Sequence, residues 1–245
     1  NYGEEIALVL IGGVNYYTGQ AFDMAAITDK AQNCGCRVGF DLAHAAGNIK
    51  LNLHDWGVDF AAWCGYKYLN GGPGAPSGVF IHERHLGRSD VPRFEGWWGH
   101  DKSTRFDMLE DYKPLETVEA WQLSNPPILS MAALLASLEI FQEAGMKSLR
   151  QKSEKLTSYL EGLINSEFEK QIEIITPISI HSRGCQLSLR LLKPVSDITK
   201  RLNERGVLCD WREPDVIRVA PVPLYNSFED CYNFVEILKD ILNEC

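Results

Sequence analysis

The stretch that decides the fold is Val58–Gly74, which reads VDFAAWCGYKYLNGGPG. An apolar, strand-like run leads here to a lysine, Lys67, and a glycine-rich loop follows. Lysine normally avoids apolar runs because its ammonium group is strongly hydrated. A lysine that is desolvated in such a setting becomes a usable nucleophile, and the obvious reaction is a Schiff base with an aldehyde cofactor. The alternative is a strand-end lysine whose stem lies on apolar surface while its charge stays in water.

A second stretch of the same kind lies upstream, at Cys36–Gly47, which reads CRVGFDLAHAAG. Its apolar run ends in Asp41, and His44 follows three positions later. The carboxyl ends of parallel strands converge on the ligand crevice of an α/β sheet. Pyridoxal phosphate enzymes need a lysine there for the aldehyde and a carboxylate that keeps the pyridine nitrogen protonated. Asp41 and Lys67 supply both groups, although Asp41 alone could also be a helix N-cap and His44 an internal histidine.

With these two stretches the chain resembles the class V branch of the fold type I, aspartate-aminotransferase-like enzymes, and more closely the kynureninases. Many relatives in this branch carry histidine immediately before the Schiff-base lysine, whereas this chain has Tyr66. Further stretches resemble kynureninases in order and spacing: Val14–Gln20, Gly96–His100, Leu123–Ile128 and Ile217–Asn226.

The resemblance implies an α/β fold with two parts. Residues 1–144 correspond to the C-terminal part of a pyridoxal phosphate-binding large domain with a mainly parallel sheet, and residues 145–245 to a smaller α+β domain. Kynureninases have a long N-terminal portion that grips the cofactor phosphate, and it has no visible counterpart here. We therefore expect the chain to be a fragment or an incomplete gene product, inactive by itself.

The activity implied by the resemblance is hydrolysis of L-kynurenine or 3-hydroxy-L-kynurenine to anthranilate or 3-hydroxyanthranilate plus L-alanine, in tryptophan catabolism and pyridine nucleotide biosynthesis. The resemblance assigns catalysis to Lys67 and Tyr66. It also implies a homodimer, with active sites built between subunits. Pyridoxal 5'-phosphate would be held by Asp41, His44, Tyr66, Lys67, Trp97 and Asn125, and the substrate by Arg218, Ser124, Asn125 and His44.

Arg218 has a physical argument of its own. It lies in the short apolar run Val216–Pro221, and a guanidinium in such a setting needs a fixed anionic partner. That partner is either an internal carboxylate or the α-carboxylate of a substrate. The resemblance favours the substrate, because fold type I enzymes that act on amino acids keep such an arginine in the small domain.

Composition argues against a nucleic-acid-binding, a membrane-spanning or a metal-binding protein. The formal net charge of −9 indicates no nucleic-acid partner, and no apolar run approaches the roughly 20 residues that span a membrane. Seven scattered cysteines indicate free thiols in a reducing compartment, and we expect the cytoplasm. Cys34 and Cys36 form one isolated pair, so no metal site is expected. His82 and His85 are expected at the surface.

The pattern of apolar residues predicts alternating strands and helices. The first half contains strands over 6–11, 37–40, 59–64 and 78–82, a helix over 23–33, and an irregular stretch over 87–123. The second half contains helices over 128–144, 147–165, 195–205 and 228–242, and strands over 172–176, 185–190, 207–211 and 216–220.

Three alternatives stay open. Another class V activity, such as a cysteine desulfurase or an aminotransferase, is the first; a desulfurase would need a cysteine on a mobile loop, whereas Cys185 lies in a strand-like segment. The second is a truncated, inactive paralogue that acts only as a dimerising chain. The third is a separate chain that supplies the missing half.

Overall fold

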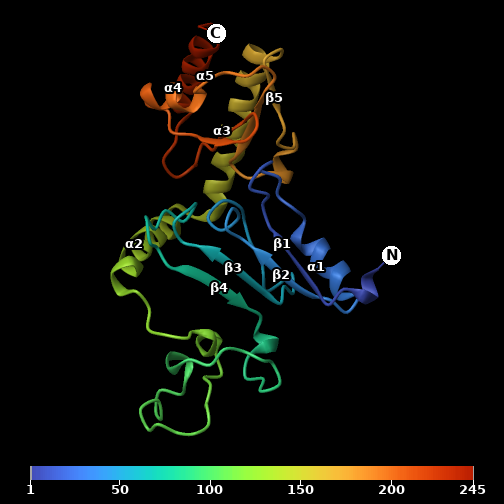
Figure 1. Cartoon of the computed structure of the whole chain (residues 1–245), viewed down its shortest axis with the longest axis vertical. Helices are drawn as coiled ribbons and strands as arrows, with labels where there is room; N and C mark the ends of the chain where they lie inside the picture. The colour runs from blue at the N-terminus through green and yellow to red at the C-terminus, as the bar shows by residue number, and fades with distance from the viewer. Residues whose placement is uncertain (1, 245) are drawn as a thin grey trace. The chain divides into compact units, whose positions relative to one another are not determined.

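A computed structural model of the chain describes residues 2–244, which divide into two compact units. The first unit comprises residues 2–11, 24–43 and 52–138, and the second comprises residues 12–23, 44–51 and 139–244. Each unit contains one four-stranded sheet (Figure 1). The chain passes between the units more than once, so neither unit is one continuous segment.

The sheet of the first unit has the strand order β1-β2-β3-β4. Strands β2 and β3 run parallel, with Phe40 opposite Ala61, and β4 runs antiparallel to β3. Phe40 and Ala61 are fully buried, and helix α1 contacts β2. The predicted α/β class is confirmed, with strands and helix at β1 (Leu8–Gly12), α1 (Met24–Gln32), β2 (Arg37–Asp41), β3 (Phe60–Cys64) and β4 (Ser77–Ile81).

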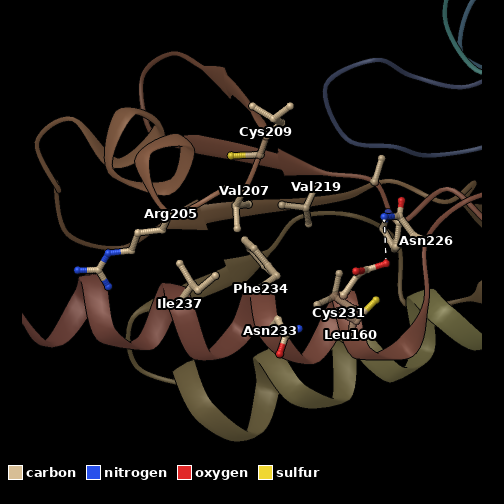
Figure 2. Close-up of a pocket in the computed structure, with 15 residues that line it drawn as sticks. Leu160, Arg205, Val207, Cys209, Val219, Asn226, Cys231, Asn233, Phe234 and Ile237 are labelled. Carbon is tan, nitrogen blue, oxygen red and sulfur yellow. Dashed lines mark hydrogen bonds between the residues drawn. The ribbon is translucent and has the colours of Figure 1, made fainter.

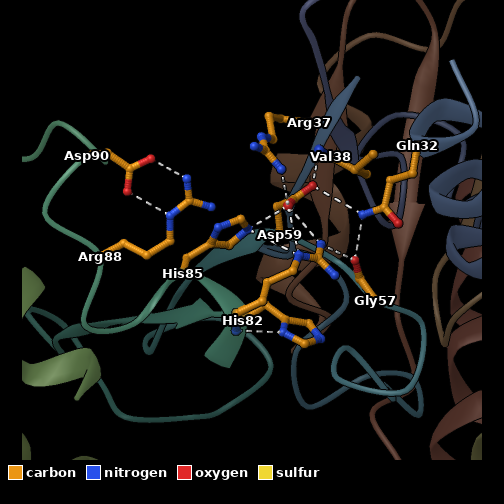
Figure 3. Close-up of polar contacts among 10 residues, drawn as sticks. Gln32, Arg37, Val38, Gly57, Asp59, His82, His85, Arg88 and Asp90 are labelled. Atoms are coloured by element: carbon orange, nitrogen blue, oxygen red, sulfur yellow. Dashed lines mark hydrogen bonds and ion pairs between the residues drawn. The ribbon is translucent and has the colours of Figure 1, made fainter. Parts of the chain in front are cut away.

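A buried carboxylate joins the amino-terminal ends of β2 and β3. Asp59, only 3% exposed, accepts hydrogen bonds from the amide of Val38 at 2.8 Å, from Arg84 at 2.7 Å and from Nε2 of His85 at 2.6 Å (Figure 3). Burial by itself raises the pKa of Asp59, but the hydrogen bonds from Arg84, Val38 and His85 outweigh it and lower the pKa to about 2. The carboxylate is therefore ionised wherever the protein is folded at ordinary pH.

The expectation that His82 and His85 lie at the surface is wrong, because both are buried. His85 bonds to Asp59, and the ring of His82 accepts from the amide of Arg84 at the start of a short 3-10 helix, η2 (Glu83–His85). Both histidines therefore have structural partners. No three His, Cys, Asp or Glu side chains within residues 2–244 form a group that could hold a metal ion.

The irregular stretch after β4 contains only two short 3-10 helices beyond η2 among the described residues, η3 (Trp97–Gly99) and η4 (Val118–Trp121). Buried His100 organises it: Nε2 lies 3.1 Å from Oγ1 of Thr104, and Nδ1 accepts from the amide of Lys113 at 3.3 Å. Side-chain contacts of His100 therefore hold this stretch in place.

Helix α2 (Ile128–Ala144) has apolar residues all around it, yet many of them are exposed. Leu129 is 90% exposed and Ile128 75% exposed. Gly145, with φ of +75°, separates α2 from α3 (Met146–Phe168). Within the described part of the chain no single helix is long and apolar enough to cross a membrane; only α2 and α3 together reach that length and composition, and they are bent at their junction.

The second unit packs helices against an antiparallel sheet of order β5-β6-β8-β7. Its core joins Leu156 and Leu160 of α3, Leu189 of β6, Ile217 of β8 and Leu238 of α5, all nearly or fully buried. Ser227 and Asp230 form a capping box that begins α5. The elements are β5 (Ile172–Ile174), η5 (Ile180–Ser182), β6 (Leu187–Leu191), α4 (Ile198–Glu204), β7 (Asp210–Arg212), β8 (Val216–Val219) and α5 (Phe228–Asn243).

Several predicted elements are shorter in the structure, and two of them have a clear local cause. Helix α4 begins three residues late because Asp197 adopts a left-handed conformation, with φ of +54°, which a right-handed helix excludes. The predicted strand over 207–211 is wrong in its first part. The amide of Val207 bonds to the carbonyl of Leu202 and so closes α4, and the chain joins the sheet only at Asp210.

Candidate active site

Asp41 and Lys67 lie at the same edge of the first unit's sheet. Asp41 is the last residue of β2 and pairs in register with Ala62 of the parallel strand β3, and Lys67 follows the end of β3. Oδ1 of Asp41 accepts from the amide of Ala43 at 2.8 Å and so caps a turn rather than a helix. Asp41 is exposed, so its carboxylate is accessible to a ligand.

Lys67 is held on a tight loop. The amide of Gly71 bonds to the carbonyl of Gly65 at 2.9 Å, and the amide of Asn70 bonds to the carbonyl of Lys67 at 3.0 Å. A Cβ on Gly65 would lie 2.4 Å from the carbonyl oxygen of Pro76, so only glycine fits there. The sequence after β3 therefore fixes the path that presents Lys67.

An aromatic side chain lies near Lys67, and a side chain of helix α2 supports the loop that carries it. Nζ of Lys67 lies 5.9 Å from the ring centroid of Tyr66, whose side chain is 54% exposed. Oγ of Ser137 in α2 donates to the carbonyl of Leu69 at 2.7 Å. Helix α2 thus supports the loop, and the phenol of Tyr66 remains open to a ligand.

Trp97 and the pair Ser124–Asn125 come from segments that touch. A Cβ on Gly96 would lie 2.2 Å from the carbonyl oxygen of Leu123, so the two backbones are in close contact. Oγ of Ser124 donates to Oδ1 of Asn125 at 3.1 Å. These three predicted site residues are exposed.

Sequence reasoning did not single out Arg105 as a site residue. Its guanidinium carbon lies 5.6 Å from the ring centroid of Trp97 and 4.7 Å from that of Trp98, and it donates to the carbonyls of Trp98 and His100. Arg105 therefore fixes both indoles. An arginine within a tryptophan-rich loop is the signal that could have revealed it.

His44 belongs to the second unit and lies in a turn fixed by Asn48. The side-chain amide of Asn48 donates to the carbonyl of His44 at 2.9 Å, and its Oδ1 accepts from the amide of Cys185 at 2.9 Å. A Cβ on Gly184 would lie 2.3 Å from Nδ2 of Asn48. The turn that carries His44 is therefore fastened to the segment before β6.

Arg218 also belongs to the second unit, and its guanidinium has protein partners. One terminal nitrogen donates to the carbonyl of Tyr16 at 2.6 Å, and the other pairs with Asp210 of β7. The stretch around Tyr16, which resembles kynureninases, is itself tied to β6 because Oγ of Ser188 donates to the carbonyl of Tyr17 at 2.5 Å. The internal ion pair foreseen as one explanation of Arg218 is therefore present.

A cavity of about 350 Å³ lies elsewhere in the second unit, between α5 and the sheet (Figure 2). Cys209 and Cys231 line it, and burial raises the pKa of each thiol to about 11. Both thiols are thus protonated and unreactive at neutral pH. None of the predicted site residues lines this cavity, so it is not part of the candidate active site.

Comparison with solved structures shows the fold. The apo cysteine desulfurase from Thermococcus onnurineus NA1 superposes with a TM-score of 0.80 at 18% identity, covering 99% of this chain and 62% of that one. An alanine–glyoxylate aminotransferase from Nostoc sp. gives a TM-score of 0.74 at 18% identity, covering 96% and 62%. The chain therefore has the fold of the type I class of pyridoxal phosphate enzymes.

Sequence comparison is more specific. Residues 149–238 match the family model described as Kynureninase C-terminal domain. The chain is 59% identical to the kynureninase of Myxococcus xanthus over 97% of this chain and 56% of that protein. It is 58% identical to the kynureninase of Koribacter versatilis over 98% and 57%. Within its class, the chain thus matches the C-terminal part of the kynureninases and spans a little over half the length of these relatives.

Proposed function

We propose that the protein catalyses pyridoxal phosphate-dependent hydrolysis of L-kynurenine or 3-hydroxy-L-kynurenine to anthranilate or 3-hydroxyanthranilate and L-alanine. The observation that carries this proposal is the identity of 59% to the Myxococcus xanthus kynureninase along nearly the whole chain. The positions of Asp41 and Lys67 after neighbouring parallel strands support it independently, because that edge of a sheet is where such enzymes bind their cofactor.

The donor groups present fit pyridoxal phosphate. Lys67 offers an amine for the aldehyde, and the exposed carboxylate of Asp41 offers a partner for the protonated pyridine nitrogen. When bound, the cofactor supplies an electron sink for the substrate α-carbon. Asp41 would hold the proton on the ring nitrogen, and Lys67 would remove and return the proton at the substrate α-carbon.

The remaining predicted site residues would bind and orient the substrate. Arg218 would hold the α-carboxylate through paired N–H groups, for which a guanidinium is better shaped than an ammonium. The exposed indole of Trp97 can donate a hydrogen bond and wall an aromatic ring. The hydroxyl of Tyr66 would exchange a proton with the substrate carbonyl or its attacking water. We assign Ser124, Asn125 and His44 to hydrogen bonds with the substrate and cofactor.

We further propose a domain organisation, an oligomeric state and a cellular compartment for the protein. Residues 1–144 would form part of the cofactor-binding domain and residues 145–245 the small domain, in a homodimer that acts in the cytoplasm. The reaction would belong to tryptophan catabolism and pyridine nucleotide biosynthesis. The identity of 59% to the Myxococcus xanthus kynureninase supports this setting, with a small amino acid as substrate.

A desulfurase activity is not favoured. That reaction needs a reactive thiol on a mobile loop, whereas Cys185 is fully buried and its amide is fixed by Asn48. The desulfurase from Thermococcus onnurineus shares the fold at 18% identity, which is far below the identity to the kynureninases.

The test is the reaction itself. The full-length gene product, supplied with pyridoxal phosphate, should release L-alanine together with anthranilate from L-kynurenine, or with 3-hydroxyanthranilate from the hydroxylated substrate. Lys67→Ala should abolish both products while leaving the protein folded. Release of sulfur from L-cysteine, with no cleavage of either kynurenine, would overturn the proposal in favour of a desulfurase.

A further inference from the structure

The guanidinium of Arg218 is held from two sides by groups of the second unit. Its side chain is only 10% exposed, so it needs fixed partners. Asp210 of β7 lies directly opposite Arg218 in the antiparallel pairing of β7 with β8, and accepts from one terminal nitrogen. The carbonyl of Tyr16 accepts from the other at 2.6 Å. Together the two acceptors fix the plane of the guanidinium.

Hydrogen bonds from neighbouring residues hold the backbone around the Tyr16 carbonyl in place. Nε2 of Gln186 donates to the carbonyl of Tyr16 at 3.1 Å, and Oδ1 of Asn15 accepts from the amides of Tyr17 and Thr18 at 2.9 Å each. The Tyr16 carbonyl is therefore a fixed point, and the orientation of Arg218 depends on its second partner, Asp210.

Asp210 is shared between two arginines. Its Oδ2 lies 2.9 Å from a terminal nitrogen of Arg212, and its Oδ1 accepts from Arg212 at 3.1 Å. Both guanidinium groups therefore reach the same carboxylate. Asp210 is also far more exposed than Arg218, at 46% against 10%, so it reaches the buried guanidinium from the solvent side.

We infer that Asp210 is a positioning residue for recognition of the substrate α-carboxylate, an inference that rests on the proposed function. Asp210 holds the Arg218 guanidinium in the orientation that receives the carboxylate, and Arg212 keeps Asp210 in place. The ligand recognised in this way carries a free α-carboxylate, because a guanidinium held in a fixed plane can form paired charge-assisted hydrogen bonds with a carboxylate.

The inference predicts a selective defect. In the full-length protein, Asp210→Asn removes the charge that orients Arg218 and should raise KM for L-kynurenine about tenfold, with kcat changed less than about threefold. Affinity for the analogue that carries hydrogen in place of the α-carboxyl group should stay the same. The preference of the protein for the carboxylate-bearing ligand should therefore fall by the same factor.

Two further variants sharpen the test. Asp210→Glu keeps the charge but displaces it by one methylene, and should give a KM between those of the wild type and Asp210→Asn. Asp215→Asn is the matched control, because Asp215 lies on the same hairpin 3.8 Å from Arg190, and it should leave KM unchanged. If Asp210→Asn does not fold, the Asp210→Glu variant must still show the selective rise in KM.

The possible outcomes are distinct. An unchanged KM in both Asp210 variants would reduce Asp210 to a surface ion pair and overturn the inference. A lowered KM would also overturn it, because it would show that Asp210 competes with the substrate for Arg218. A wild-type protein that is inactive on both kynurenines would contradict the proposed function instead. Failure of the proposed function is therefore distinguishable from failure of the inference about Asp210.

Discussion

Asp41 is the last residue of β2 and Lys67 follows the neighbouring parallel strand β3, in which Ala62 pairs in register with Asp41. Parallel strands place their carboxyl ends at one edge, so residues that are 26 positions apart in sequence belong to the same edge. A carboxylate and an amine at this edge are the two groups that the proposed chemistry requires.

The first prediction concerns the charge of Asp41. Asp41→Asn keeps the size of the side chain and an oxygen that can accept from Ala43, so the fold should remain intact. Loss of the negative charge should cost about 3 kcal/mol of transition-state stabilisation, or roughly a hundredfold in kcat. Steady-state kinetics of the full-length protein checks this, with circular dichroism as the control for folding. Near-normal turnover would leave Asp41 only as the cap of its turn.

The second prediction concerns the contact between Gly96 and Leu123. In Gly96→Ala the new methyl group would meet backbone atoms of Leu123 at 2.2 to 2.6 Å, and backbone cannot move aside as a flexible side chain can. We expect a loss of about 1–3 kcal/mol in the free energy of unfolding, and weaker substrate binding because Trp97 and Ser124 are displaced.

The matched control for this variant is Gly162→Ala, in the interior of α3. Nothing lies within 4 Å of the position where its Cβ would be placed. Alanine is the better helix former by about 0.5–1 kcal/mol, so this variant should be more stable than the wild type. Equal effects of the two substitutions in chemical denaturation would contradict the close contact at Gly96.

The third prediction concerns Ser137, which supports the lysine loop. Ser137→Ala removes the bond to the carbonyl of Leu69 and leaves that acceptor without its donor, at a cost of about 1 kcal/mol in stability. Faster hydrogen exchange at residues 65–71 should accompany it. Ser130→Ala, in the same helix, removes only an exposed local bond to Pro127 and should change neither quantity.

The fourth prediction is a pH dependence caused by Asp59. Its pKa in the folded protein, about 2, lies below its ordinary value of 3.8. A lowered carboxyl pKa means that the ionised form stabilises the fold. This contribution is complete above the ordinary pKa and is lost as pH falls toward 2.

The test compares Asp59→Asn with the wild type by denaturation at several pH values. At pH 7 the variant should be less stable by about 3 kcal/mol, because it breaks a buried network with Arg84 and His85. The difference should shrink as the pH falls through the range between the two pKa values of Asp59. Asp90→Asn, which breaks only an exposed pair with Arg88, should show no measurable change at neutral pH. A difference that does not depend on pH would contradict the ionised state of Asp59.

Local sequence was enough to predict the strand ends that carry Asp41 and Lys67. Short apolar runs define strands, and the polar residue that ends each run follows directly from the pattern. Helices α2 and α5 were also predicted well: the predicted ranges 128–144 and 228–242 differ from the structure by at most one residue at either end.

Residues that depend on distant partners could not be predicted in this way. His85 looked exposed because its partner, Asp59, lies 26 positions away, and only folding brings the two together. Asp210 was not singled out because its opposition to Arg218 depends on the register of a hairpin whose first strand starts later than the apolar pattern suggests. Arg105 was missed because its contacts with the rings of Trp97 and Trp98 exist only in the folded loop.

The most direct test of the proposed site is the identity of the lysine that binds the cofactor. The full-length gene product is incubated with pyridoxal phosphate, reduced with borohydride, digested and examined by mass spectrometry. The reduced cofactor should be found on the peptide that contains Tyr66, Lys67 and Tyr68, and Lys67→Ala should abolish this labelling. Stoichiometric labelling of a different lysine, with Lys67 unmodified, would contradict the assignment.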